Sequence, residues 1–135
     1  MDKWGDELLS VINNPVSREY FRRFLIRNCA EEYLRCLLEI RKYNSQKDAE
    51  ERFSILYTIV NKFVKIGSKD TIGLSSPVRA DILNIWKDIE ENGNMELLVD
   101  ELFEEAYYFI YLLLRDDLYP KFIHSPERAE MKLVQ

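Results

Sequence analysis

The stretch from Leu102 to Ser125, LFEEAYYFIYLLLRDDLYPKFIHS, is the most apolar part of the chain and decides its fold class. Its apolar residues return every three or four positions, which is the spacing of one face of an α-helix. The uncharged run 106–114 is too short to cross a bilayer. We therefore expect a central apolar helix here, followed by a short helix through residues 116–123.

The same helical spacing continues through most of the chain. Apolar stripes predict further helices around residues 8–12, 20–25, 34–38, 53–64 and 78–89. No segment alternates in the manner of a strand, and the tail 126–135 has only a marginal helical pattern. The sequence therefore predicts an all-α bundle.

Local signals mark where these helices begin and end. Residues 13–15 (NNP) and 91–94 (ENGN) break the pattern. The predicted N-caps are Asn28 with Glu31 as its partner, a residue of the segment 45–48, and Ser76 before Pro77. Between the helices, GSKDTIGLSSP (67–77) is the longest stretch without helical periodicity, and such a long loop is typical of a functional segment.

Length and charge limit the classes of protein that remain. A chain of 135 residues fits one domain, and we expect a single domain over 1–135 that can belong to a longer protein. The net charge of −5 argues against a general nucleic-acid binder, which needs a basic surface. The N-terminus lacks the pattern of a signal peptide, so we expect a cytoplasmic protein.

The sequence offers few groups for catalysis or metal binding. Cys29 and Cys36 lie seven positions apart on what we interpret as one helix, about 10.5 Å along its axis, which is beyond disulfide reach. We expect both thiols to be buried or half-buried. His124 is the single histidine, too little for a zinc site, and Gly67 and Gly73 lack the Lys-Ser/Thr of a phosphate-binding loop. We therefore predict no catalytic residue, no metal and no cofactor.

One helix combines an apolar stripe with a basic face, formed by Arg18, Arg22, Arg23 and Arg27. Basic faces of this kind can dock weakly on anionic lipid, at about 1 kcal/mol per charge. The alternative is a solvated face above a core stripe. A helical interaction or lipid-docking module is one hypothesis for the whole chain.

Three stretches, in order, resemble one family. FRRFLIRNCAEEYLRCLLEIRKY (21–43), IVNKFVKIGSKDTIGLSSPVR (59–79) and the opening stretch 102–125 resemble segments of RGS domains, the regulators of G-protein signalling. The third match is the most specific, because nine residues fall in register: Phe103, Ala106, Ile110, Tyr111, Leu113, Asp117, Tyr119, Pro120 and Phe122. Trp4 suits the family's first helix, and the resemblance covers about residues 4–125.

The resemblance implies a bundle of about nine helices that binds a GTP-loaded Gα subunit at its switch regions and speeds GTP hydrolysis. Such a monomeric regulator needs no catalytic residue of its own. It would be cytoplasmic and recruited to the inner face of the plasma membrane. Carried over by position, the Gα-facing residues would be Cys29, Glu32, Tyr33, Gly73, Leu74, Ser75, Arg79, Leu113, Asp117, Leu118 and Lys121.

Three of these positions differ from the family pattern. Tyr33 and Gly73 stand where the pattern has asparagine, and Lys121 stands where it has arginine. The alternative to GTPase activation is therefore an RGS-homology module, as in Rho exchange factors, that binds Gα as effector or localiser without activating it.

Overall fold

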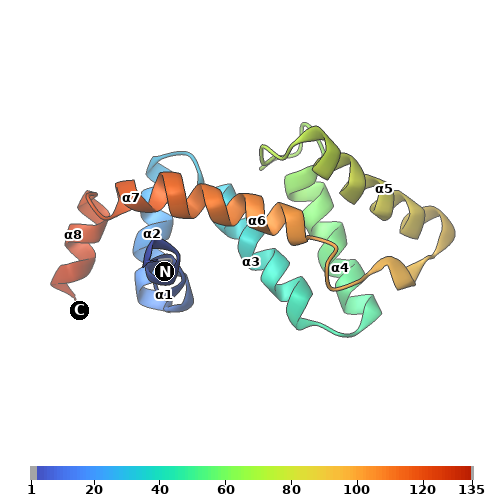
Figure 1. Ribbon diagram of the computed structural model, residues 1–135, viewed down its shortest axis with the longest axis horizontal. Coiled ribbons are helices and arrows are strands. Elements are labelled where there is room, and N and C mark those ends of the chain that lie inside the picture. The colour runs from blue at the N-terminus through green and yellow to red at the C-terminus, as the bar shows by residue number, and fades with distance from the viewer. Residues whose placement is uncertain (1–2, 135) are drawn as a thin grey trace. The chain divides into compact units, whose positions relative to one another are not determined.

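The structure, a computed structural model, describes residues 3–134; residues 1, 2 and 135 of the predicted domain lie outside it. All regular structure in the described residues is helical, which confirms the all-α prediction (Figure 1). The α-helices are α1 Lys3–Asn13, α2 Pro15–Arg27, α3 Glu31–Ser45, α4 Ala49–Ile59, α5 Ser76–Asn92, α6 Glu104–Leu113, α7 Tyr119–Phe122 and α8 Pro126–Leu133.

Three short helical segments complete the chain. The π-helical turns η1 (Val60–Val64) and η3 (Leu114–Leu118) continue α4 and α6, and η2 (Met95–Leu97) is a 3₁₀ turn. Because η1 continues α4, and η3 joins α6 to α7 without a break, the described residues form seven separate helices and one 3₁₀ turn rather than the nine or so helices expected. No helix of the described residues is long and apolar enough to cross a membrane.

The chain divides into two compact units, and the division falls inside α3 and α6. One unit consists of Met1–Leu34 and Ile110–Gln135, and the other of Arg35–Phe109. Both units are helical and each has its own buried side chains.

Aromatic side chains fill the core of the first unit. Phe21, Phe122 and Tyr119 are at most 1% exposed. Phe21 meets Phe122 edge to face, with ring centroids 5.1 Å apart, and Phe24 does the same at 5.5 Å. Full burial of each such ring contributes about 1.5–3 kcal/mol. The predicted stripe 20–25 and the stretch 116–123 therefore build one core.

In the second unit a buried arginine organises the polar contacts. Arg52 is only 5% exposed. Its guanidinium donates to the carbonyl oxygens of Gln46 and Leu98, both at 2.7 Å, and lies 4.8 Å from the ring centre of Tyr43. It also pairs with Asp100, so the buried charge is compensated.

The predicted helix boundaries are partly right. Asp48 caps α4 by accepting from the N–H of Glu51 at 3.0 Å, as the segment 45–48 predicted. The predicted Ser76 cap is wrong by one residue: the N–H of Arg79 donates to the carbonyl of Ser75, and the Ser75 hydroxyl accepts from Val78. The adjacent Ser75 and Ser76 give the same signal in the sequence. In the fold, the carbonyl of Ser75 accepts the hydrogen bond that begins the helix.

The prediction for Asn28 is also wrong. Asn28 ends α2 rather than starting α3, and its side-chain amide donates to the carbonyl of Phe24 at 2.8 Å. The tail of marginal pattern forms α8, because Ser125 caps it by accepting from the N–H of Arg128 at 3.1 Å.

Candidate interaction surface

The residues expected to face a partner fall into two groups. Seven of the eleven belong to the first unit: Cys29, Glu32, Tyr33, Leu113, Asp117, Leu118 and Lys121. The remaining four belong to the second unit: Gly73, Leu74, Ser75 and Arg79.

The turn between α2 and α3 holds Cys29 in an unusual conformation. The N–H of Ala30 donates to Leu25 at 2.8 Å and that of Cys29 to Ile26 at 3.1 Å, which is the Schellman pattern of helix ends. Cys29 takes the left-handed position of this motif, with φ of 56°, where glycine is usual. The predicted helical, buried or half-buried Cys29 is therefore wrong: it lies in a turn and is exposed.

This turn leads directly into α3, where Glu32 and Tyr33 occupy the first helical turn, both half-buried. A carboxylate at a helix N-terminus is stabilised by the free N–H groups there. Cys36 lies one turn further, buried, and burial raises the pKa of its thiol to about 12. Both cysteines are free, as predicted, although the prediction had placed them on one helix.

The second segment of the first unit is the π-helical turn η3. Asp117 and Lys121 are exposed and pair at 3.0 Å, one turn apart. Leu113 is half-buried, whereas Leu118 is only 7% exposed and packs inside the unit. The polar pair is therefore the accessible part of this segment. π-Helical turns inside α-helices are frequent at functional sites.

The loop of the second unit, residues 65–75, also follows a π-helical turn, η1. Backbone N–H groups tie it down: Asp70 donates to Lys62 at 3.1 Å and Ile72 to Phe63 at 3.0 Å. Ile72 and Leu74 are 1% and 7% exposed, so they anchor the loop. Gly73, between these two anchors, is exposed, as is Ser75.

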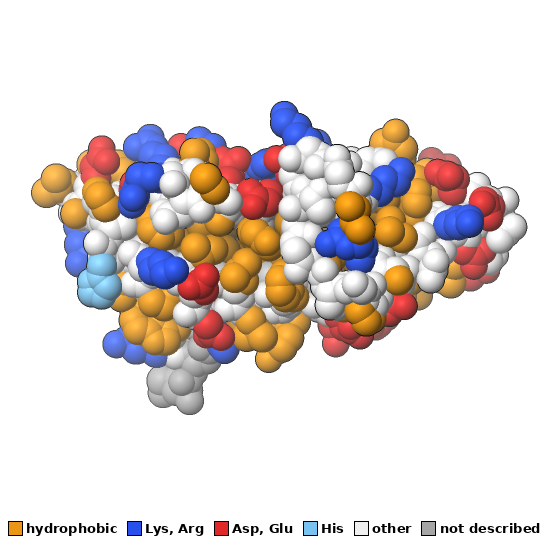
Figure 2. Space-filling model, turned by 90° about the horizontal axis from the view of Figure 1, so that it is seen from above, with side chains coloured by type: hydrophobic (Ala, Val, Ile, Leu, Met, Phe, Trp, Pro, Cys, Tyr) orange, Lys and Arg blue, Asp and Glu red, His pale blue; other side chains and the backbone are white. Residues whose placement is uncertain are grey.

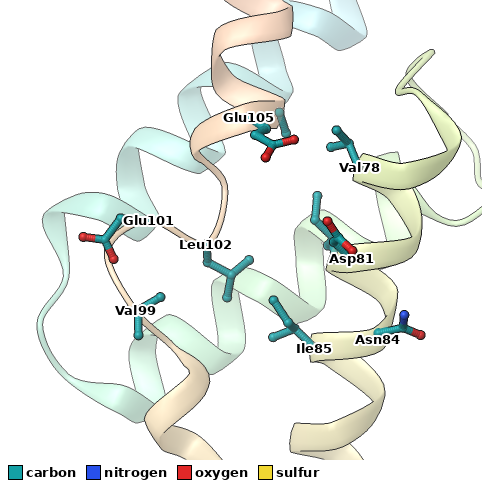
Figure 3. Close-up of a pocket in the computed structure, with 10 residues that line it drawn as sticks. Val78, Asp81, Asn84, Ile85, Val99, Glu101, Leu102 and Glu105 are labelled. Carbon is teal, nitrogen blue, oxygen red and sulfur yellow. The ribbon is translucent and has the colours of Figure 1, made fainter.

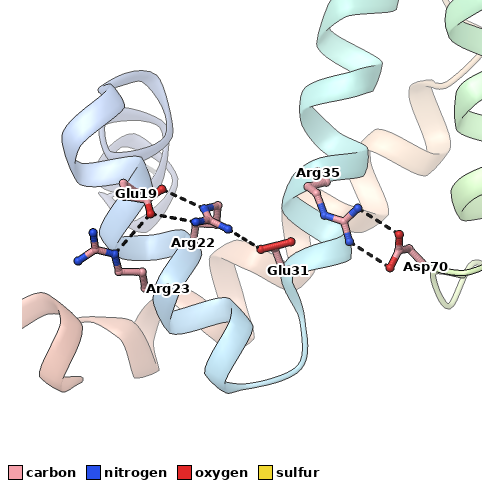
Figure 4. A network of polar contacts seen from close by, with 6 residues as sticks. All are labelled: Glu19, Arg22, Arg23, Glu31, Arg35 and Asp70. Atoms are coloured by element: carbon pink, nitrogen blue, oxygen red, sulfur yellow. Dashed lines mark hydrogen bonds and ion pairs between the residues drawn. The ribbon is translucent and has the colours of Figure 1, made fainter.

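Two arginines fix the loop through their side chains. Arg79 donates to the carbonyl oxygens of Val64, Ile72 (2.8 Å) and Leu74 (3.4 Å). Arg35 forms a two-point pair with Asp70, both contacts at 3.1 Å, and its hydrogen bond lowers the pKa of that carboxyl (Figure 4). Arg79 therefore positions the loop. The sequence analysis did not single out Arg35 or Asp70. The one signal available in the sequence was Asp70 itself, the single carboxylate of the loop.

The basic face of α2 is largely occupied by contacts within the first unit. Arg22 bonds Glu19 and Glu31, both at 2.9 Å, and its hydrogen bond lowers the pKa of Glu19 (Figure 4). Arg27 makes a two-point pair with Glu127 at 2.9 and 2.8 Å. Arg18 donates to the carbonyl of Ile12, and Arg23 pairs with Glu19.

No group of three or more His, Cys, Asp or Glu side chains is placed to hold a metal ion within residues 3–134. His124 is exposed, just after α7. The candidate residues lie on a loop held by backbone hydrogen bonds, in an exposed ion pair between η3 and α7, and in a turn with a left-handed cysteine. These exposed features make up the candidate surface for contact with a partner.

The chain belongs to the RGS family: the family model for the "Regulator of G protein signaling domain" matches residues 7–127. It is 26% identical over 136 residues to Regulator of G-protein signaling 19 of Rattus norvegicus, covering 98% of this chain and 57% of that protein. It is 28% identical over 129 residues to Regulator of G-protein signaling 7 of Homo sapiens, covering 96% and 24%. The resemblance inferred from the sequence is confirmed, and the chain spans at most 57% of these relatives' length.

Proposed function

We propose that this chain binds the switch regions of an activated, GTP-bound Gα subunit and accelerates GTP hydrolysis, ending the signal. Membership of the RGS family supports the class of partner. The observation that carries the proposal for this chain is Asp117. It is exposed on a π-helical turn and stands in register with the family's aspartate.

The mechanism needs no catalytic group from this chain. A Gα subunit already carries its arginine finger and water-positioning glutamine, and hydrolyses GTP at about 10⁻² s⁻¹ unaided. A partner that binds the switches best in their transition-state arrangement lowers the barrier by differential binding. Its contact groups must therefore be held rigidly, since a mobile surface would follow the switches instead of selecting one arrangement.

Each contact group has a role that its environment supports. Asp117 and Glu32 would accept hydrogen bonds from switch N–H or hydroxyl groups, and Leu113, half-buried, would add apolar contact. In the second unit, the exposed Gly73 and Ser75 would be the loop residues that contact Gα. Arg79 acts through the loop, because its guanidinium is committed to backbone carbonyls.

Two of the candidate contact residues are buried leucines. Leu74 and Leu118 are each 7% exposed, so they support the contact segments from below. Direct contact of either with a partner would require the surface to rearrange. We therefore assign both a positioning role in the proposed interface.

Single-turnover GTP hydrolysis by a panel of Gα subunits, with and without the chain, tests the proposal. We expect faster hydrolysis by at least one subunit. Asp117→Ala should weaken the effect by about 10- to 150-fold, since loss of a hydrogen bond to a charged group costs about 1.5–3 kcal/mol. An unchanged rate for every subunit at saturating chain would exclude activation.

Asp116 provides the matched control. It neighbours Asp117, is equally exposed, and pairs with Arg115 at 2.7 Å. Asp116→Ala should leave hydrolysis close to that of the wild type. Equal losses from both substitutions would show that overall charge, rather than the Asp117 position, carries the effect.

A second candidate function is Gα binding without activation, as effector or localiser. Tyr33 and Gly73 favour it, because they replace the two amide side chains of the family pattern. This function predicts binding to GTP-like Gα with no preference for the GDP–aluminium fluoride form. Restoration of activation by Gly73→Asn in an inactive wild type would locate the difference in the loop.

We place the chain in the cytoplasm, recruited by Gα to the inner face of the plasma membrane, as a monomer. The four α2 arginines would add only weak lipid contact, because each has a partner within its own unit. Vesicle sedimentation with anionic lipid tests this: a charge-reversed Arg23→Glu/Arg27→Glu variant should bind as weakly as the wild type.

A further inference from the structure

A groove on the second unit shares no residue with the surface proposed to bind Gα. It lies between α5 and the segment 99–106 and encloses about 420 Å³. Its floor is apolar: Ile82 and Ala106 are buried, while Ile85 and Leu102 are half-buried and project into it from opposite walls (Figure 3). Val99, at one edge, is 45% exposed. The groove therefore offers apolar surface that the chain itself leaves uncovered.

Three carboxylates stand around this apolar floor. Asp81 projects from α5 and Glu105 from the first turn of α6, while Glu101 lies on the segment between, with its carboxylate turned outward from the floor (Figure 3). All three are exposed. Among the described residues, no lysine or arginine forms an ion pair with any of them, whereas neighbouring Asp100 is paired with Arg52. The rim thus holds negative charge that nothing in the unit neutralises by contact.

The rim belongs to a strongly acidic segment. Residues 80–105 contain nine Asp and Glu against one lysine, a net charge of −8, so the remainder of the chain carries +3. Acidic side chains gather visibly at the end of this unit where α5 terminates (Figure 2). A field of one sign around an apolar floor selects a ligand of opposite charge and speeds its association.

We propose that this groove binds a basic amphipathic helix of another protein. Apolar side chains one turn apart would enter the floor between Ile85 and Leu102, and lysine or arginine residues flanking them would pair with Asp81, Glu101 and Glu105. This is the helix-in-groove mode of recognition, in which apolar anchors give contact and rim charges give register. The site goes beyond Gα binding and does not depend on it.

A second copy of the chain fits the groove poorly. The arginines of α2, its most basic face, are engaged with Glu19, Glu31 and Glu127 of their own unit. A second copy also brings its own acidic segment, which the first would repel. The charges therefore favour a different, basic partner.

The test measures fluorescence anisotropy with a labelled Leu–Lys peptide of about 16 residues, with leucines on one helical face. A Leu–Glu peptide with the same leucine pattern, and a scrambled Leu–Lys peptide without an apolar face, are the control ligands. We expect saturable binding of the amphipathic Leu–Lys peptide alone, weakening as salt is raised.

Variants separate the rim from the floor. Asp81→Lys/Glu105→Lys should raise Kd about tenfold or more, because two attractive pairs become repulsive. Val99→Ser should raise Kd through lost apolar contact. The matched control is Glu90→Lys/Glu91→Lys, which reverses two exposed charges on the same helix outside the groove and should change Kd less than about threefold.

Circular dichroism and thermal unfolding confirm that each variant is folded, and the milder Asp81→Asn/Glu105→Gln replaces any variant that is not. Four results would overturn the proposal: no saturable binding, equal binding of the Leu–Glu peptide, equal loss in the Glu90/Glu91 control, or self-association of the wild type that Asp81→Lys/Glu105→Lys removes. The last would identify a second copy as the occupant.

Discussion

Replacing Cys29 by glycine should stabilise the chain, although Cys29 lies in the proposed contact surface. Cys29 occupies the left-handed position after α2, with φ of 56°. The hydrogen bonds of Ala30 to Leu25 and of Cys29 to Ile26 require that conformation whichever residue is present. Because the side chain is exposed, removing it leaves no cavity.

The expected gain follows from two opposing terms. The left-handed conformation costs a residue with a Cβ atom about 1–2 kcal/mol. Glycine avoids that cost, but its freer unfolded chain offsets about 0.5–1 kcal/mol. The net stabilisation is about 0.5–1 kcal/mol. For 135 residues this corresponds to a rise in Tm of about 2–4 °C.

Urea denaturation and thermal unfolding of matched variants measure this gain. Cys29→Ala keeps the Cβ atom and should match the wild type within about 0.5 kcal/mol. Asn28 has an ordinary φ of −99°, and Asn28→Gly should lower the free energy of unfolding by about 1 kcal/mol. The substitution adds backbone flexibility and removes the hydrogen bond from the side-chain amide to the carbonyl of Phe24.

The reasoning fails if Cys29→Gly is no more stable than Cys29→Ala. That result would mean that the turn relaxes without cost, so no strain is stored at this position. Gα binding by the same variant tests a separate point: the affinity should fall only if the Cys29 thiol itself contacts Gα.

Three further predictions concern the loop and the buried titratable groups. Arg79→Ala should destabilise the second unit by about 2–3 kcal/mol and speed amide hydrogen exchange in residues 65–75, because the carbonyls of Val64, Ile72 and Leu74 lose their donor; unchanged exchange would refute the positioning role. Iodoacetamide at mildly alkaline pH should modify Cys29 alone, and both cysteines only after unfolding, as counted by mass spectrometry. Finally, burial raises the pKa of Cys36 and Tyr43 to about 12, from 9.0 and 10.0. The unfolded chain therefore loses these protons first, and the free energy of unfolding should fall as pH rises from about 9 to 12, a fall that Cys36→Ala should reduce.

Helix content was predictable because its causes are local. The apolar spacing of 20–25 and 116–123 predicted helices that bury Phe21, Tyr119 and Phe122. The stretch 102–125 also indicated the family, because its residues can be matched to the RGS pattern without knowledge of distances in the folded chain.

Helix ends were less predictable, because several residues compete for one cap. Asn28 and Glu31 have capping-box spacing, yet the chain closes α2 with a Schellman turn. The hydrogen bonds of that turn compensate for the left-handed conformation of Cys29, a conformation that no propensity scale favours for cysteine.

The sequence by itself determined the all-α class, the family and the residue types of the proposed Gα surface. Tertiary structure alone decided which of those residues are accessible: Asp117 and Gly73 are exposed, whereas Leu74 and Leu118 are buried and Arg79 is bound to loop carbonyls. It also decided that Arg35 meets Asp70 and that the carboxylates of Asp81, Glu101 and Glu105 surround one groove. Helical periodicity depends on neighbours three or four positions apart, while these contacts join residues that only the folded chain brings together.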